Sequence, residues 1–403
     1  MLSTHFSREL IGLKEIIVKK VEQKEKEMEI TIELERHEQD CPCCARTTRT
    51  IHDYRNQRVR DIPAFGKQVV LILRKRRYTC PSCGKHFAER NSFLPKYYRM
   101  TNRLALYVTA LLTDTVSFTS VSKQVGLSLS TVIRIFDLVN YPKATMPQVL
   151  SIDEFKGNAG GDKYQVILTD PKTGRVLDIL PSRKKYALIQ YFKPMQRERV
   201  QFFVSDMWQP YHDIATSFFK QAVPLIDKYH FVRQVIWAFE DVRKQEQKKF
   251  SKSHRIYFKR SKKLLTRPFP TLDDTQKQQV NVMLYASPTL SSAYFLKEQF
   301  FQFLHCKDRD TAKMALLKWM DASRKSNIPR FAACAETFHN WFTPILNTFD
   351  APYTNGFTEG CNNRIKVLKR NAYGYRNFQR FRNRILHVFH NSYLEKHQAE
   401  IAA

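Results

Sequence analysis

The chain has 403 residues with 67 Lys+Arg against 38 Asp+Glu, a formal charge of +29. So large a positive excess favours a polyanionic partner, with nucleic acid ahead of an anionic membrane. No apolar run approaches the roughly 18 residues of a transmembrane helix, and "MLSTHFSREL" at the N-terminus lacks the order of a signal peptide. The basic segments also lack a sustained apolar face, so we expect a soluble intracellular protein without a membrane role.

Two close cysteine pairs follow a predicted β-hairpin over residues 14–35. The pairs read "CPCC" and "CPSC", and two such turns can present four thiolates to a tetrahedral Zn²⁺. In a reducing compartment this spacing favours metal over disulfides, although four reduced buried thiols are the alternative. Cys43 leaves open which of the first three cysteines is a ligand. The predicted structural zinc ligands are Cys41, Cys44, Cys80 and Cys83.

The segment from residue 103 to 139 is helical by its apolar period. Within it, "SVSKQVGLSLSTVIRIF" places Gly126 at a turn and Ser128 at the start of a second helix. This pattern predicts a helix-turn-helix whose second helix enters the major groove, although short helix pairs also occur in other α-rich proteins. "NYPKATMP" then indicates a linker. The residues expected to contact DNA here are Ser128, Ser130, Thr131 and Arg134.

From residue 149 onward, three predicted strands, "VLSIDEF", "KYQVILTD" and "GRVLDIL", precede alternating helices and strands. This order predicts an α/β core whose first strands form a meander. Asp153 and Asp206 each end a predicted apolar strand, where two carboxylates can share a divalent metal. An isolated aspartate at a strand end is more often a turn residue.

The segment from about residue 228 to 348 shows almost no strand signal and is predicted to be mainly helical. At its start, His230 could orient a phosphate or a metal-bound water, but a structural hydrogen bond is the more common role at such a position. Trp208, Trp237 and Trp341 are expected to lie in the core rather than to stack on bases.

Glu359 heads the stretch "EGCNNRIKVLKRN". It could be a simple helix-start acid, with Thr358 or Asn355 as the cap. On a helix, however, it also begins a polar and basic stripe opposite an apolar face. From residue 364 to 384 there are eight cations and no acid, so this segment is expected to follow a DNA backbone. The residues expected to contact DNA here are Asn363, Lys366, Lys369, Arg370 and Arg376.

Together, Asp153, Asp206 and Glu359 could hold two Mg²⁺ or Mn²⁺ ions about 4 Å apart. Phosphodiester chemistry of this kind depends on position and charge rather than on a covalent nucleophile.

The cysteine pairs, the helix-turn-helix, "SIDEFKG", "VSDMWQPY", "DKYHFVRQ" and "TNGFTEGCNNRIKVLKRNAYGYRNFQRFRNRIL" occur in an order that resembles the bacterial insertion-sequence transposases of the ISL3 family. The resemblance implies an RNase H-like catalytic domain with a DDE triad on Asp153, Asp206 and Glu359. It also implies that the long helical stretch is an insertion in that domain, and that the N-terminal modules bind the terminal inverted repeats.

We therefore expect a multidomain α+β protein with an RNase H-like α/β core interrupted by an α-helical insertion. The expected domains are a β-hairpin and zinc-binding domain (1–100), a helix-turn-helix domain (101–147), the first part of the catalytic core (148–245), the helical insertion (246–348) and the C-terminal helices of the core (349–403).

The predicted function is that of a DDE transposase that cuts DNA at its element's ends and joins them to target DNA, acting as a homodimer in the bacterial cytoplasm, associated with the nucleoid. The alternatives are a sequence-specific DNA-binding regulator with a non-catalytic RNase H-like domain, and a nuclease that cuts without joining.

Overall fold

The computed structural model describes residues 11–13 and 15–402, and the side chains of Tyr257 and residues 395–402 are not described. The N-terminal "MLSTHFSREL" and Lys14, the first residue of the predicted hairpin, lie outside the described residues. The chain divides into two compact units. Residues 1–141, 367–375 and 383–403 form the first unit, and residues 142–366 and 376–382 form the second.

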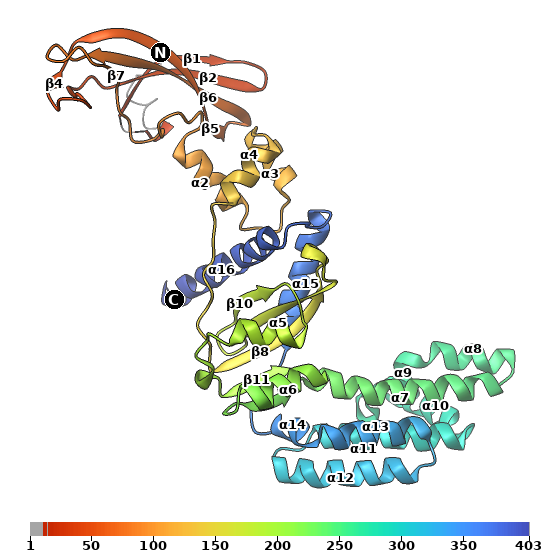
Figure 1. The fold of residues 1–403 in the computed structure, drawn as a ribbon. Helices are drawn as coiled ribbons and strands as arrows, with labels where there is room; N and C mark the ends of the chain where they lie inside the picture. Colours follow the sequence, from red (N-terminus) through yellow and green to blue (C-terminus); the bar gives the residue numbers. More distant parts are fainter. Residues whose placement is uncertain (1–10, 14, 403) are drawn as a thin grey trace. The chain divides into compact units, whose positions relative to one another are not determined.

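The first unit begins with a twisted β-sheet, drawn in red and orange in Figure 1. Its strand order is β1-β2-β6-β5, and β7 pairs with β6. β1 and β2 are antiparallel, which confirms the predicted hairpin, whereas β2 and β6 are parallel. The strands of this unit are β1 (Ile16–Gln23), β2 (Glu27–Leu34), β3 (Gln39–Asp40), β4 (Thr47–Thr48), β5 (Ile51–Ala64), β6 (Lys67–Thr79) and β7 (His86–Ala88).

Three short helices follow in the same unit, α2 (Asn102–Leu111), α3 (Phe118–Val125) and α4 (Leu129–Phe136). Gly126 takes a left-handed conformation (φ 66°) that a side chain would disfavour, and so it ends α3. Ser128 caps α4 by accepting a hydrogen bond from the backbone N–H of Thr131. Both predicted local features are therefore present.

The long C-terminal helix α16 (Phe378–Ala402) contributes most of its length to the first unit. Its fully buried Arg384 donates hydrogen bonds to the carbonyls of Leu112, Asp114 and Val116, in the turn between α2 and α3. These bonds satisfy carbonyls at the end of α2 and hold α16 against the three short helices.

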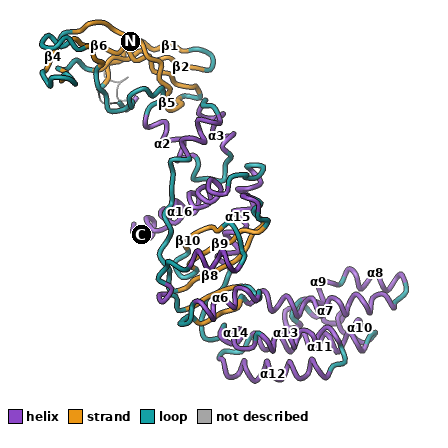
Figure 2. The backbone as a smooth tube through the Cα atoms, in the orientation of Figure 1, coloured by secondary structure: helices purple, strands orange, loops and turns teal. Residues whose placement is uncertain are grey.

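The second unit contains a five-stranded sheet of order β10-β9-β8-β11-β12, drawn in orange in its part of Figure 2. β9 runs antiparallel to both neighbours, and β8, β11 and β12 are parallel. The first three strands thus form the predicted meander. The strands are β8 (Val149–Lys156), β9 (Tyr164–Asp170), β10 (Arg175–Leu180), β11 (Phe202–Ser205) and β12 (Val223–Ile226).

One strand end is wrongly predicted. Asp153 lies within β8, because β8 continues to Lys156 through pairing with β9. Its pairing with β11 ends at Ser151, so Asp153 lies just beyond that shared edge. Asp206 does follow the last residue of β11 directly, as predicted.

The two faces of this sheet are covered differently. Helices α5 (Lys185–Phe192) and α6 (Gln209–Phe218) pack on the face that carries Leu150, Ile152 and Phe203. Because side chains alternate along a strand, Ser151, Asp153 and Phe155 point to the opposite face. There they meet the start of α15 (Gly356–Asn371) and of α16.

Between β12 and α15 the second unit is helical, as predicted, and Figure 1 shows these helices side by side. One aromatic-rich core holds them together, centred on Phe300, Trp319 and Phe338. α7 runs through residue 245, so the predicted boundary at 245/246 falls inside a continuous helix. The helices are α7 (Lys228–Lys249), α8 (Lys252–Arg260), α9 (Lys262–Thr266), α10 (Asp274–Tyr285), α11 (Pro288–Leu304), α12 (Arg309–Lys325), α13 (Pro329–Asn340) and α14 (Phe342–Asn347). Every helix in the described chain is too short or too polar to cross a membrane.

Candidate functional site

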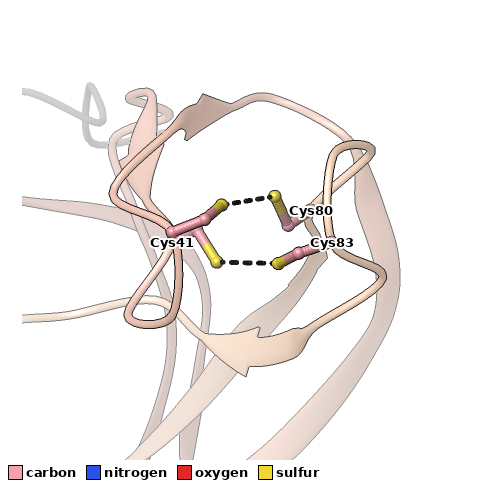
Figure 3. A group of neighbouring side chains, drawn as sticks. Cys41, Cys80 and Cys83 are labelled. Carbon is pink, nitrogen blue, oxygen red and sulfur yellow. Dashed lines mark hydrogen bonds between the residues drawn. The ribbon is translucent and has the colours of Figure 1, made fainter.

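Four cysteines of the first unit form a compact cluster, three of which are labelled in Figure 3. The sulfur of Cys41 lies 3.6 Å from that of Cys83, and the sulfur of Cys44 lies 3.5 Å from that of Cys80. Four thiolates around one Zn²⁺ at about 2.3 Å would be separated by similar distances. Cys43 is exposed and outside the cluster, and its backbone N–H points at the sulfur of Cys41. The four predicted ligands are therefore brought together without Cys43.

Backbone N–H groups beside the cysteines favour the ionised form of their thiols. Burial opposes ionisation of Cys80, but the backbone N–H groups of Cys83 and Ser82 lower its pKa to about 6. The backbone N–H of Lys85 favours the thiolate of Cys83, yet burial and the neighbouring sulfurs raise its pKa to about 12. Thiolates crowded in this way repel one another until a divalent cation neutralises them, so the donor set fits structural Zn²⁺.

In the second unit, Asp153 and Asp206 form an acidic pair on neighbouring strands. Burial and the nearby Asp206 carboxylate raise the pKa of Asp153 to about 7. A like charge and a low-dielectric site both disfavour the ionised form, and a bound cation would reverse both effects. The sheet thus brings together two of the three carboxylates predicted from the sequence.

The start of α15 is fixed to this part of the sheet by buried polar contacts. Asn362 donates a hydrogen bond from Nδ2 to Oδ2 of Asp153 at 2.7 Å. The hydroxyl of Thr358 lies 2.9 Å from that of Ser151 and 2.7 Å from that of Thr169. Asn355, just before the helix, accepts a hydrogen bond from Ser151. These contacts determine how α15 leaves the sheet.

Glu359 lies in the first turn of α15 and is exposed. It is one helical turn before Asn362, on the side of the helix nearest the acidic pair. In the described part of the chain, the cysteine cluster is the sole group of three or more Cys, His, Asp or Glu side chains with ligand atoms within 4.8 Å of one another. The ligand atoms of Asp153, Asp206 and Glu359 therefore do not converge to that distance.

A further chain of polar contacts begins at Asp206. Nε2 of His230 lies 2.6 Å from Oδ1 of Asp206, and Nδ1 of His230 lies 3.1 Å from a terminal nitrogen of Arg233. Burial lowers the pKa of His230, but its contact with Asp206 outweighs burial and raises the pKa above its ordinary value. Because Arg233 can only donate, the neutral form of His230 accepts at Nδ1 and carries its proton on Nε2. His230 therefore holds the Asp206 carboxylate in place.

α15 also carries the basic stripe expected from its sequence. Cys361, Ile365 and Leu368 are buried, whereas Asn363, Lys366 and Arg370 are exposed on the other side. Lys369 is half-buried, and Arg376 is exposed after the helix. The amphipathic pattern predicted for this helix is confirmed, and its exposed side suits a phosphate backbone.

The predicted recognition helix α4 borders a groove in the first unit. Ser128, Ser130 and Arg134 are exposed, and Thr131 is half-buried. Thr131 and Arg134 line a groove of about 520 Å³. Its other lining residues are Arg60, Tyr97, Tyr98, Arg99, Met100, Leu127, Ile135 and Leu138. This lining is basic and aromatic and contains no acid, which suits a nucleic acid.

The segment before α2 contributes part of this lining and is hydrogen-bonded to β5; the sequence-based predictions missed it. Tyr97 is 86% exposed and has a positive φ of 70°. The backbone of Arg99 accepts a hydrogen bond from Arg60, and the side chain of Gln57 donates to the carbonyl of Tyr98. The run "KYYR" was the available signal, because adjacent exposed tyrosines beside cations are typical of nucleic-acid surfaces.

Three models of known protein families match this chain, in the order zinc-binding domain, helix-turn-helix domain and transposase domain. Residues 37–83 match the zinc-finger of transposase IS204/IS1001/IS1096/IS1165. Residues 89–140 match the helix-turn-helix domain of transposase family ISL3. Residues 150–385, more than half of the chain, match the ISL3 family of DDE type described as "Transposase".

Individual relatives agree with these matches. The transposase for insertion sequence element IS1001 from Bordetella parapertussis is 29% identical over 353 residues, 85% of this chain and 86% of that protein. The transposase for insertion sequence element IS1557 from Mycobacterium tuberculosis is 23% identical over 246 residues, 54% of each chain. A Lactococcus lactis protein named ATP-dependent protease matches only 113 residues, 28% of this chain, at 34% identity, too short a match to indicate an activity. Since the matches to family models cover all three modules, the chain belongs to the ISL3 family of insertion-sequence transposases.

Proposed function

We propose that this transposase cuts DNA at the terminal inverted repeats of its element and joins the resulting 3′-hydroxyls to target DNA, using Asp153, Asp206 and Glu359. The observation that carries this proposal is the half-buried pair of Asp153, on β8, and Asp206, directly after β11, in which the pKa of Asp153 is raised to about 7. A strongly perturbed carboxyl in such a pair is typical of a catalytic site. Glu359 is included because it lies one helical turn before Asn362, and Asn362 donates a hydrogen bond to Asp153.

The sheet topology supports an RNase H-like core. Three antiparallel strands are followed by two strands parallel to the first, with the order β10-β9-β8-β11-β12. In that core, helices α7–α14 are an insertion between β12 and α15. We propose that, despite this insertion, Asp153 on β8 and Asp206 at the end of β11 lie on the same side of the sheet as α15.

The acidic pair fits Mg²⁺ or Mn²⁺, because its hard oxygen donors are held close and repel each other. Bound there, such ions would activate the attacking oxygen and stabilise the leaving oxygen of the phosphodiester. Asn362 and His230 each hold one of the two aspartates in position, and Lys366 and Arg370 would bind adjacent phosphates. Because joining needs two ends at once, we propose a homodimer on DNA, in the bacterial cytoplasm at the nucleoid.

The decisive test concerns Glu359, the least enclosed of the three acids. We expect wild-type protein to cut and join DNA that carries the element's inverted repeats in Mg²⁺, and Glu359→Gln to do so at least about 100-fold more slowly while binding the same DNA equally well. Glu198→Gln, which removes an exposed acid from a short 3-10 helix between α5 and β11, is the matched control and should behave as wild type.

Two outcomes would contradict the proposal. If Glu359→Gln cuts and joins at the wild-type rate, Glu359 is a helix-start residue and the triad is wrong. If wild type binds the repeats but never cuts them, a DNA-binding regulator becomes the better account. Cutting without joined products would instead indicate a nuclease.

We also propose that the groove beside α4 binds the DNA backbone next to the recognition helix. Arg60, Arg99 and Arg134 form no side-chain hydrogen bond or ion pair with any described residue, so their charges are available to phosphates. Arg99→Ala should lower the slope of log affinity against log salt concentration by about 0.9, the value of one phosphate contact.

Titration of labelled repeat DNA at several salt concentrations measures this slope. Lys20→Ala is the control, because it removes an exposed cation from β1, at the opposite edge of the sheet from β5. An unchanged slope for Arg99→Ala, or an equal decrease for Lys20→Ala, would exclude a specific role for the groove.

A further inference from the structure

Three side chains form a stacked stripe along the exposed side of α7. Tyr229, Arg233 and Trp237 follow one another at intervals of four residues, which places them on one side of the helix. The guanidinium of Arg233 lies 5.2 Å from the ring centre of Tyr229 and 4.7 Å from that of Trp237. Both distances are typical of cation–π contacts, so the three side chains support one another. We call them the α7 stripe.

The packing of the helix does not account for this stripe. The other side of α7 fills the core of the helical segment with Phe231, Val235 and Phe239. Tyr229 and Trp237 are 55% and 54% exposed, and so they leave much aromatic surface in water. Trp237 was expected in the core from the sequence, and that expectation is wrong. Large exposed aromatic surface next to a cation indicates a binding surface.

The stripe begins at the candidate catalytic site. Tyr229 packs edge-on against His230, with ring centres 5.6 Å apart, and His230 contacts Asp206. Arg233 also contacts His230, whereas Trp237 lies two turns away, roughly 12 Å from Tyr229 along the helix axis. A strand bound along the stripe would therefore lead away from Asp206.

We propose that the α7 stripe stacks on unpaired bases of the DNA strand next to the cleavage position and thereby keeps that strand apart from its complement. The faces of a base can stack on aromatic side chains only after the base has left the duplex, and such stacking tolerates any sequence. Arg233 adds positive charge between the rings, which favours the nucleic acid over an uncharged partner. This proposal rests on the proposed catalytic role of Asp206.

Cleavage of two DNA substrates tests the proposal. One substrate is fully paired across the repeat end and its flank, and the other carries mismatches in the flank, so that its bases are already unpaired. On paired DNA, Trp237→Ala should cut roughly 10- to 100-fold more slowly than wild type, the value of one lost stacking contact. On mismatched DNA the variant should approach the wild-type rate, because strand separation is no longer needed. Trp237→Phe should restore most of the rate on paired DNA.

Tyr285→Ala provides the control, since Tyr285 is 93% exposed on α10 and should affect neither substrate when replaced. Equal cutting of paired DNA by Trp237→Ala and wild type would overturn the inference while leaving the proposed function intact. Equal slowing on both substrates would also overturn it, and would favour a structural role or contact with a second copy of the chain. Wild type that cuts neither substrate would count against the proposed function itself.

Discussion

Replacing Cys80 with serine should abolish zinc binding and unfold the region around the two cysteine turns. Cys80 is fully buried, and its sulfur lies 3.5 Å from that of Cys44. A structural Zn²⁺ contributes on the order of 10 kcal/mol to the folding of a small domain, and loss of one thiolate removes much of that contribution. We expect the zinc content, measured by atomic absorption after dialysis, to fall from one ion per chain to nearly none.

The unfolding should remain local, because the sheet of the first unit has a core of its own. Ile16, Ile32 and Leu71 are among the fully buried residues of this core. The core contains none of the four cysteines. Limited proteolysis should therefore cut the variant within 37–50 and 79–88 before it cuts β1 or β2. A metal chelator should reproduce this pattern in wild-type protein.

Cys43→Ser is the matched control. Cys43 lies between two of the proposed ligands in the sequence but is exposed and outside the cluster. This variant should keep its zinc and its protease resistance. If Cys43→Ser lost zinc while Cys80→Ser retained it, the assignment of the four ligands would be wrong.

Features set by neighbouring residues were predictable from the sequence. The spacing of the cysteines, the glycine and serine around the turn between α3 and α4, and the apolar period of α15 each act over a few residues. Gly126 and Ser128 have the conformations expected of them because a helix end requires a left-handed residue and a cap whatever the rest of the chain does.

Features that depend on distant pairing were missed. The extent of β8 beyond Asp153 depends on hydrogen bonds to β9, and those bonds cannot be read from the apolar run of β8 alone. No role was predicted for Asn362 from the sequence. In the structure it donates a hydrogen bond to Asp153, a residue more than two hundred positions away. Trp237 was predicted to lie in a core. Its burial depends on which side of α7 faces the other helices, and the sequence of α7 alone does not determine that side. In each case the deciding contact is long-range.

Replacing Asp153 with asparagine should abolish cutting and joining and yet stabilise the metal-free protein. Asparagine lacks the negative charge that a divalent cation requires, and loss of several kcal/mol of charge stabilisation slows the reaction on the order of 1,000-fold or more. The variant should still fold, because the backbone N–H of Glu154 keeps an acceptor. Asn362 has a buried Oδ1 without a partner among the described residues, so its amide can turn over to accept a hydrogen bond from the new side chain.

The gain in stability should depend on pH in a defined direction. The pKa of Asp153 is raised from the model-peptide value of 3.8 to about 7, so the folded chain binds this proton more tightly than the unfolded chain. Ionisation therefore destabilises the fold increasingly as the pH rises from about 4 to about 7, and the cost is complete above that range. At about 1.4 kcal/mol per pH unit it reaches on the order of 2 to 4 kcal/mol.

Thermal unfolding at pH 5 and pH 8 without divalent metal measures this effect. We expect Asp153→Asn to unfold roughly 5 °C or more above wild type at pH 8, and the difference to shrink at pH 5. Added Mg²⁺ should raise the midpoint of wild type more than that of the variant, because the ion binds the folded acidic pair. Asp213→Asn, which removes an aspartate paired with Lys185 and Gln209 on the surface of α6, should give no such gain. The opposite result would be a variant that cuts poorly but has a lower unfolding midpoint than wild type at pH 8. It would show that Asp153 stabilises the fold, and that its repulsion from Asp206 is too weak to indicate a metal site.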